Sequence, residues 1–146
     1  MRKFLAVLLA SLVSVCAFAS VEQLVSEDAY IRTQEGLCWE FTVPENTEKV
    51  VIMCATDAKF TSKMTFAVVD TPGDAKNFCN GGEYSYLKGT YKTKATTYDL
   101  TLRDLVPGRT YWFCAWNGAL GIFSAKQYKI QASIVAFVHP HAAPLL

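Results

Sequence analysis

The sequence predicts an all-β protein, a two-layer antiparallel β-sandwich, and three observations favour this class. Apolar and polar residues alternate with a period of two along five of six strand segments, as half-buried strands require. Turn-forming residues such as proline, glycine, asparagine and aspartate recur between these segments. About seven or eight short strands in a domain of this size are typical of two packed sheets.

The six strand segments lie between residues 37 and 134. In the first, 37–43, Leu37, Trp39 and Phe41 share one face of the strand. The second, 49–55, is apolar on both faces, which is typical of a central strand. The remaining four segments alternate clearly, and they are 64–68, 98–103, 111–116 and 128–134.

Other parts of the chain give weaker signals. Residues 30–32 and 83–88 are candidates for two further strands. Residues 20–28 could hold a helical turn, because Val21, Leu24 and Val25 recur at helical spacing. Residues 71–82 are rich in turn formers, so we expect one long loop there.

The beginning of the chain has the three-part pattern of a secretory signal peptide. Arg2 and Lys3 precede an apolar stretch, and Ala17 and Ala19 stand at the −3 and −1 positions before a cleavage site. That stretch is shorter than the roughly 20 residues that span a bilayer. We therefore expect a secreted or extracytoplasmic protein (periplasm, extracellular space or secretory lumen) without a membrane span. The expected parts are a signal peptide (1–19), one β-sandwich domain (20–138) and a flexible tail (139–146).

Charge and composition exclude some classes of partner. The whole chain has 14 Lys+Arg against 13 Asp+Glu, and loss of Arg2 and Lys3 with the leader leaves 12 against 13. A near-neutral domain lacks the basic surface of a nucleic-acid-binding protein, so we expect no nucleic-acid partner. A hydrophobic share of 51% and a charged share of 18% predict a folded core rather than disorder.

Four cysteines remain after the leader: Cys38, Cys54, Cys79 and Cys114. An even number in an oxidising compartment predicts two disulfides, and the wide spacing does not fit a zinc site. If 37–43 and 49–55 formed a hairpin with Trp39 inward, Cys38 would face Cys54 at a Cβ separation of about 4.5–5.5 Å. This favours Cys38–Cys54 with Cys79–Cys114 as the complement, and the other pairings stay open.

Residues 105–111, Leu-Val-Pro-Gly-Arg-Thr-Tyr, resemble the L-x-P-G-x-x-Y corner of fibronectin type III domains. The resemblance implies a structural corner at Pro107 and Gly108, with Tyr111 bonding back across it. The same stretch is similar to the P-G-x-Y-x-x-x-V segment of bacterial pre-peptidase C-terminal domains. Residues 39–44 are similar to the entry strand of those domains. Both families are non-catalytic modules, and the expected sandwich is immunoglobulin- or fibronectin III-like, or jelly-roll-like.

No sequence pattern of an enzyme is present. The chain has no G-x-S-x-G, P-loop or dinucleotide-binding pattern, and its two histidines, His139 and His141, lie near the end. We therefore expect no enzyme activity, no catalytic residues and no cofactor. Clustered oxygen donors could hold calcium, but such residues more often form turns, so no metal site is predicted. These donors are Asp70, Asp74, Asn77 and Asn80.

Aromatic residues mark the candidate binding surface. If Tyr111 and Phe113 face inward, Trp112 and Trp116 face outward, where tryptophan often marks an interaction site. Alternatively, the loop that carries Phe78 and Cys79 covers both tryptophans. We expect a secreted, non-catalytic binding module for a protein or carbohydrate ligand, or else an accessory, cargo-binding or inhibitory module of a secreted hydrolase. The candidate binding residues are Trp112, Trp116, Tyr84, Tyr86 and Tyr91.

Overall fold

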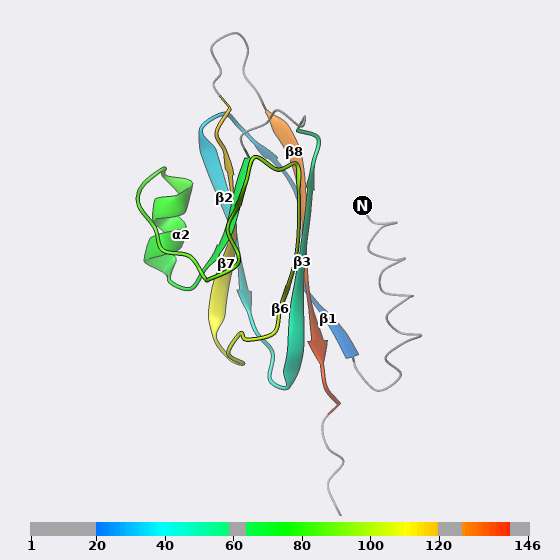
Figure 1. Cartoon of the computed structure of the whole chain (residues 1–146). Coiled ribbons are helices and arrows are strands. Elements are labelled where there is room, and N and C mark those ends of the chain that lie inside the picture. The colour runs from blue at the N-terminus through cyan, green and yellow to red at the C-terminus, as the bar shows by residue number, and fades with distance from the viewer. Residues whose placement is uncertain (1–19, 59–63, 120–126, 141–146) are drawn as a thin grey trace, which may run out of the picture.

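The computed structural model describes residues 20–58, 64–119 and 127–140, and it consists of two four-stranded sheets packed face to face (Figure 1). The predicted signal peptide (1–19) and most of the predicted tail lie outside the described residues. In chain order the elements are β1 (Ser20–Ile31), β2 (Glu35–Thr42), β3 (Thr47–Thr56), β4 (Met64–Val69), α2 (Pro72–Cys79), β5 (Lys92–Thr93), β6 (Thr97–Leu102), β7 (Thr110–Asn117) and β8 (Tyr128–Val138).

The strand order is that of a jelly roll. One sheet, here called the β1 sheet, has the order β1-β8-β3-β6, and the other, the β2 sheet, has the order β2-β7-β4-β5. Every strand pairing is antiparallel, and consecutive strands lie in opposite sheets except for β4 and β5. The prediction of an all-β two-layer sandwich is confirmed. Of the architectures left open, the order matches the eight-stranded jelly roll and not the ABED/CFG order of immunoglobulin domains.

The core between the sheets is built around an aromatic stack. Phe113 of β7 is fully buried, and its ring centroid lies 5.5 Å from that of Trp39, 5.1 Å from that of Tyr98 and 6.1 Å from that of Phe66. Because side chains alternate along a strand, the neighbours of Phe113 in β7 point to the outer face of the β2 sheet. The alternation along β7 therefore determines which of its side chains reach the outer surface, where they can contribute to a binding site.

The expectation of a helical turn within residues 20–28 is wrong, because this segment belongs to β1. That strand pairs with β8 along its whole length, and the register shifts between Gln23 and Val25. The shift is a β-bulge, which lets the adjacent Leu24 and Val25 both pack against the core. The bulge interrupts the period-two alternation and produces the spacing that resembles a helix in the sequence.

Residues 71–82, expected as one long loop, contain the helix α2. Thr71 is its N-cap: its hydroxyl accepts the Asp74 backbone N–H at 3.1 Å, and Pro72 occupies the first turn. A threonine N-cap and a proline in the first turn are signals of a helix start. The sequence Pro72-Gly73 is also typical of a turn, and for this reason the sequence alone predicts a loop. The weaker strand candidate at 30–32 overlaps the end of β1 at Tyr30 and Ile31, whereas 83–88 forms no strand.

The corner before β7 carries the hydrogen bond that the fibronectin resemblance implies. The backbone N–H of Val106 donates to the Tyr111 hydroxyl at 2.9 Å, and Gly108 has a φ of +81° that favours glycine.

We expect Tyr111→Phe to lower the free energy of unfolding by about 1 kcal/mol, since the Val106 N–H loses its acceptor. Urea denaturation measures this, with the exposed Tyr30→Phe as control. Equal stability of the two variants would contradict the prediction.

Candidate binding site

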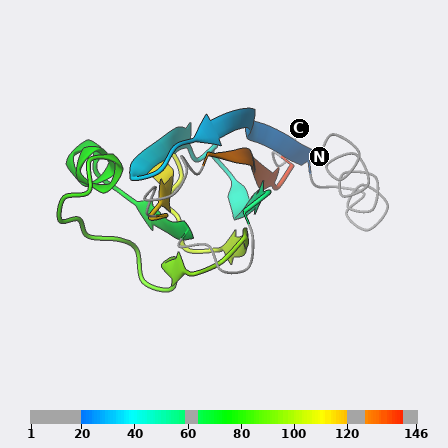
Figure 2. The same ribbon diagram turned by 90° about the horizontal axis from the view of Figure 1, so that it is seen from above.

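The outer face of the β2 sheet is covered by α2 and by the chain that follows it. Figure 2 shows the helix standing outside the sheet, with the segment after it passing along the sheet toward β5. Between helix and sheet lies a second apolar cluster, separate from the core, here called the outer cluster. Its buried members are Ala67, Val69, Ala75, Phe78 and Cys114, and Cys38, Tyr84, Trp112 and Trp116 pack against it.

Hydrogen bonds fix the segment that carries the tyrosines. The Leu87 backbone N–H donates to the Val68 carbonyl at 2.9 Å, and the buried Thr90 hydroxyl donates to the Leu87 carbonyl at 2.7 Å. The Val68 backbone N–H in turn donates to the Thr90 hydroxyl at 3.1 Å. Closer to the helix, the Ser85 N–H donates to the Asp74 carboxylate at 3.1 Å. The segment is therefore fastened to both β4 and α2.

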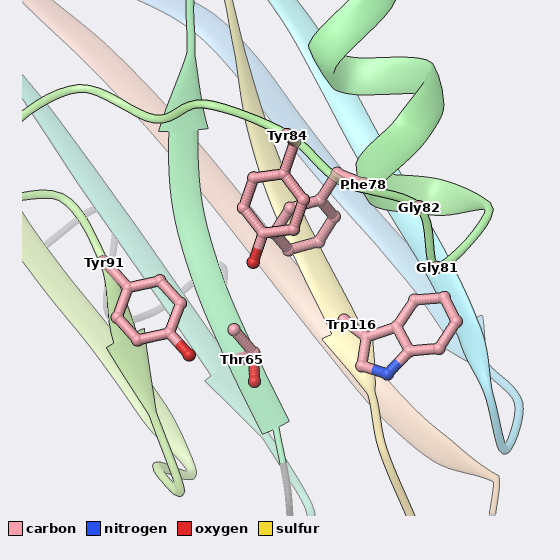
Figure 3. Close-up of a pocket in the computed structure, with 7 residues that line it drawn as sticks. All are labelled: Thr65, Phe78, Gly81, Gly82, Tyr84, Tyr91 and Trp116. Carbon is pink, nitrogen blue, oxygen red and sulfur yellow. The ribbon is translucent and has the colours of Figure 1, made fainter.

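Between this segment, α2 and β7 lies a pocket of about 220 Å³. Figure 3 shows the indole of Trp116 on one side and the rings of Tyr84 and Tyr91 on the other, with Thr65 between them. The hydroxyls of the two tyrosines point toward the space above Thr65. The pocket thus combines flat aromatic faces with hydroxyl groups. Its described lining residues are Thr65, Phe78, Gly81, Gly82, Tyr84, Tyr91 and Trp116.

The tyrosines form a continuous row beside the pocket. The ring centroids of Tyr84 and Tyr86 are 6.3 Å apart, and the rings of Tyr86 and Tyr91 stack at 5.0 Å. Tyr86 and Tyr91 are 48% and 44% exposed, so part of each ring is accessible to a partner although the two rings cover one face of each other. Burial, followed by the neighbouring Tyr91, raises the pKa of Tyr84. Its hydroxyl therefore keeps its proton at neutral pH and can donate a hydrogen bond.

The structure brings together four of the five aromatic residues that the sequence singled out. Trp116, Tyr84 and Tyr91 line the pocket and Tyr86 stacks beside it, whereas Trp112 packs against the outer cluster without lining the pocket. Both tryptophans are half-buried because they pack against the outer cluster, and the turn at Gly81 also lies close to the Trp116 ring. Sequence reasoning missed the lining residues Thr65, Phe78, Gly81 and Gly82. The Asn-Gly-Gly triplet after α2 is the signal that could have indicated a tight turn there.

The preferred cysteine pairing, Cys38–Cys54, is wrong. The hairpin on which it depended does not form, because β2 and β3 lie in opposite sheets. Cys54 faces the core, where burial raises its pKa to about 12. The complementary pairing also fails, since Cys79 contacts Cys38 rather than Cys114. The Sγ atoms of Cys38 and Cys79 are 2.7 Å apart, beyond the 2.05 Å of a disulfide bond, and the four described cysteines are free.

The acidic residues considered for calcium serve structural roles. Asp70 accepts a hydrogen bond from the Arg109 guanidinium at 2.9 Å, and Asp74 accepts one from the Thr71 hydroxyl at 2.9 Å. Among the described residues, no three or more histidines, cysteines or carboxylates are grouped so that they could hold a metal ion.

In the part of the chain that the structure describes, no helix has the length and apolarity needed to cross a membrane.

Comparisons with known proteins support the fold. No protein-family model and no curated protein matches the chain. A structure of the Triatoma virus empty capsid is similar with a TM-score of 0.51 and 10% identity, over 85% of this chain and 93% of that chain. Two further structures are a Yersinia pseudotuberculosis-derived mitogen (TM-score 0.45, 13% identity, 86% and 91% covered) and the Aeromonas hydrophila periplasmic inhibitor of g-type lysozyme (0.43, 12%, 82% and 87%). At 10% identity, the similarity to the capsid structure supports the sandwich fold and carries no conclusion about function.

Proposed function

We propose that this protein is an extracytoplasmic, non-catalytic binding module that holds a glycan by inserting one sugar residue into the aromatic pocket. The observation that carries the proposal is the lining of the pocket, where the indole of Trp116 and the rings of Tyr84 and Tyr91 lie around the side chain of Thr65. The extracytoplasmic location rests on the signal-peptide pattern of the sequence.

The size of the pocket favours a single ring-shaped group. Its volume of about 220 Å³ is below the roughly 300–1,000 Å³ of pockets that enclose whole drug-sized ligands. A glycan would therefore place one of its sugar residues in the pocket, and its other sugar residues would stay outside. The exposed rings of Tyr86 and Tyr91 extend the aromatic surface beyond the pocket, where they can contact the next residue of a chain.

The chemistry of the lining favours a sugar over an apolar side chain. The C–H groups on a sugar face carry partial positive charge and suit the negative faces of indole and phenol rings. The hydroxyls of Tyr84, Tyr91 and Thr65 can exchange hydrogen bonds with sugar hydroxyls. An apolar side chain in the same place would strip water from these hydroxyls without replacing its hydrogen bonds, which costs free energy.

The same lining supports binding without catalysis. Glycoside hydrolysis ordinarily uses two carboxyl groups that flank the scissile bond. Among the described residues that line the pocket, the titratable groups are the hydroxyls of Tyr84 and Tyr91. Burial raises the pKa of Tyr84, so this hydroxyl is a hydrogen-bond donor and not a base at neutral pH.

Replacement of pocket aromatics tests the proposal. An array of neutral and acidic oligosaccharides identifies a binding sugar, and isothermal titration calorimetry then measures its affinity for each variant. We expect Trp116→Ala and Tyr91→Ala each to weaken binding by about tenfold or more, because loss of one stacking surface costs about 1.4 kcal/mol or more. Tyr30→Ala, which removes a tyrosine that is 61% exposed on β1, is the matched control and should bind as the parent does.

Two results would overturn the proposal. One is a parent protein that binds no sugar on the array. The other is a sugar whose affinity is the same in the parent, Trp116→Ala and Tyr91→Ala, provided that their circular dichroism spectra show the same fold. Capture of a protein partner whose affinity falls in these variants would replace the glycan with a protein ligand at the same pocket.

A further inference from the structure

Three cysteines meet beneath α2, on the outer face of the β2 sheet. Cys38 of β2 lies directly opposite Cys114 of β7 in the strand register. Cys79, the last residue of α2, places its Sγ 2.7 Å from that of Cys38. The Cys38 thiol also lies within 3.4 Å of the Ala75 carbonyl, one turn earlier in the helix. The C-terminal end of α2 is therefore seated on Cys38.

A glycine in β2 allows the backbones of β2 and α2 to approach each other closely beside this contact. Gly36 lies two residues before Cys38 on the same face of β2, and a Cβ there would stand 2.7 Å from the Cα of Cys79 and 3.3 Å from its carbonyl oxygen. Only glycine lets the end of α2 approach β2 this closely. Because the close approach involves two backbones, the proximity of the two sulfur atoms does not depend on side-chain rotamers alone.

We propose that Cys38 and Cys79 form a disulfide in an oxidising compartment and thereby fasten α2 to β2. The two thiols lose two protons and two electrons, and a disulfide-bearing oxidant such as oxidised glutathione takes up the electrons and is released as two thiols. The first cysteine thiolate attacks the oxidant to give a mixed disulfide and one free glutathione. The second cysteine then displaces the other glutathione and closes the Cys38–Cys79 bond.

Accessibility decides among the possible pairs. Cys38 and Cys79 are partly exposed residues, whereas Cys114 and Cys54 are buried, so the pair Cys38–Cys79 lies nearest to solvent. Cys54 faces the core between the sheets, away from the other three sulfur atoms. Cys114 is the competing partner for Cys38, because directly opposed residues in antiparallel strands have Cα separations of about 4.5–5.5 Å, which a disulfide can bridge. The contact between the Cys38 and Cys79 sulfur atoms and the partial exposure of both residues favour Cys38–Cys79.

The bond bears directly on the aromatic pocket but does not depend on what the pocket binds. Phe78, Gly81 and Gly82 line the pocket and lie within three residues of Cys79. A Cβ at Gly81 would stand 3.3 Å from the Trp116 ring, so this turn packs closely on the indole. Fastening Cys79 to β2 therefore holds one wall of the pocket in place.

Peptide mapping of the oxidised protein tests the pairing, because trypsin places each cysteine in a different peptide. Cys38 falls in 33–49, Cys54 in 50–59, Cys79 in 77–88 and Cys114 in 110–126. The purified protein is oxidised with oxidised glutathione, unfolded, blocked with N-ethylmaleimide, digested and analysed by mass spectrometry without reduction. We expect 33–49 linked to 77–88, with N-ethylmaleimide on both other peptides.

Substitutions and stability provide independent readouts. Cys54→Ser, the matched control, should keep the linked peptide, and Cys79→Ser should lose it. Reduction should lower the melting temperature of the oxidised parent by about 10 °C, and should not change that of Cys79→Ser. Amide hydrogen exchange in residues 72–82 should be faster in the reduced parent than in the oxidised parent.

Three results would overturn the proposal: a link between 33–49 and 110–126, a link of 50–59 to either 33–49 or 77–88, or N-ethylmaleimide on all four peptides after oxidation. The first would make Cys114 the partner of Cys38 and leave α2 unfastened. Glycan binding is measured separately, so loss of the proposed disulfide and loss of the proposed ligand are distinguishable.

Discussion

Phe113→Ala is expected to lower the free energy of unfolding by about 3–5 kcal/mol, because it removes the ring at the centre of the core. Phe113 is fully buried and lies between Trp39 of the same sheet and Tyr98 of the opposite sheet. The cavity left behind would have aromatic walls on both sides, which cannot collapse without moving a strand. Guanidinium denaturation followed by far-ultraviolet circular dichroism measures the loss.

The matched control removes a large apolar side chain at the surface. Val106 is 52% exposed, and Val106→Ala is expected to change stability by no more than about 0.5 kcal/mol. A loss below about 1 kcal/mol for Phe113→Ala would mean that the two sheets do not share this core. Such a result would contradict the packing on which the orientation of β7, and so the outward direction of Trp116, depends.

Gly36→Ala is expected to lower the free energy of unfolding by about 1–3 kcal/mol, although it adds only a methyl group. The added Cβ would stand 2.7 Å from the Cα of Cys79 and 3.1 Å from the Trp116 ring. Since the nearest atom belongs to the backbone, rotation of a side chain cannot relieve the overlap, and the end of α2 must move. We also expect a smaller yield of the Cys38–Cys79 peptide link after oxidation.

Gly73→Ala is the matched control for this prediction. Gly73 lies in the first turn of α2, and a Cβ there would meet no atom within 4 Å. Alanine has a higher helix propensity than glycine, so the control is expected to be neutral or stabilising by up to about 1 kcal/mol. Chemical denaturation of both variants decides the question. Equal stability of Gly36→Ala and the parent would show that α2 is not seated closely on β2.

The alternation of side chains allowed the fold class and the orientation of β7 to be predicted. Tyr111, Phe113 and Ala115 face the core and Trp112, Cys114 and Trp116 face outward, as a period of two requires. The sequence therefore indicated three lining residues of the pocket, Trp116, Tyr84 and Tyr91, but not Thr65, Phe78, Gly81 and Gly82, whose positions depend on strand pairing and on the turn after α2. What the pocket binds is still a prediction.

The order of the strands could not be predicted, because alternation defines the faces of a strand and not its neighbours. The hairpin expected between β2 and β3 assumed that consecutive strands pair, whereas the turn at 43–46 crosses between the sheets. The error in the cysteine pairing follows from this alone. Likewise, the bulge in β1 depends on pairing with β8, more than a hundred residues away.

The pairing of β1 with β8 has a consequence for how the chain acquires its structure. In the described sheet β8 is the neighbour of both β1 and β3, so β1 has no hydrogen-bonded strand partner until β8, roughly a hundred residues later in the chain, is present. Contacts this distant in sequence form slowly. Closure of the β1 sheet by this pair is therefore expected to be a late step of folding.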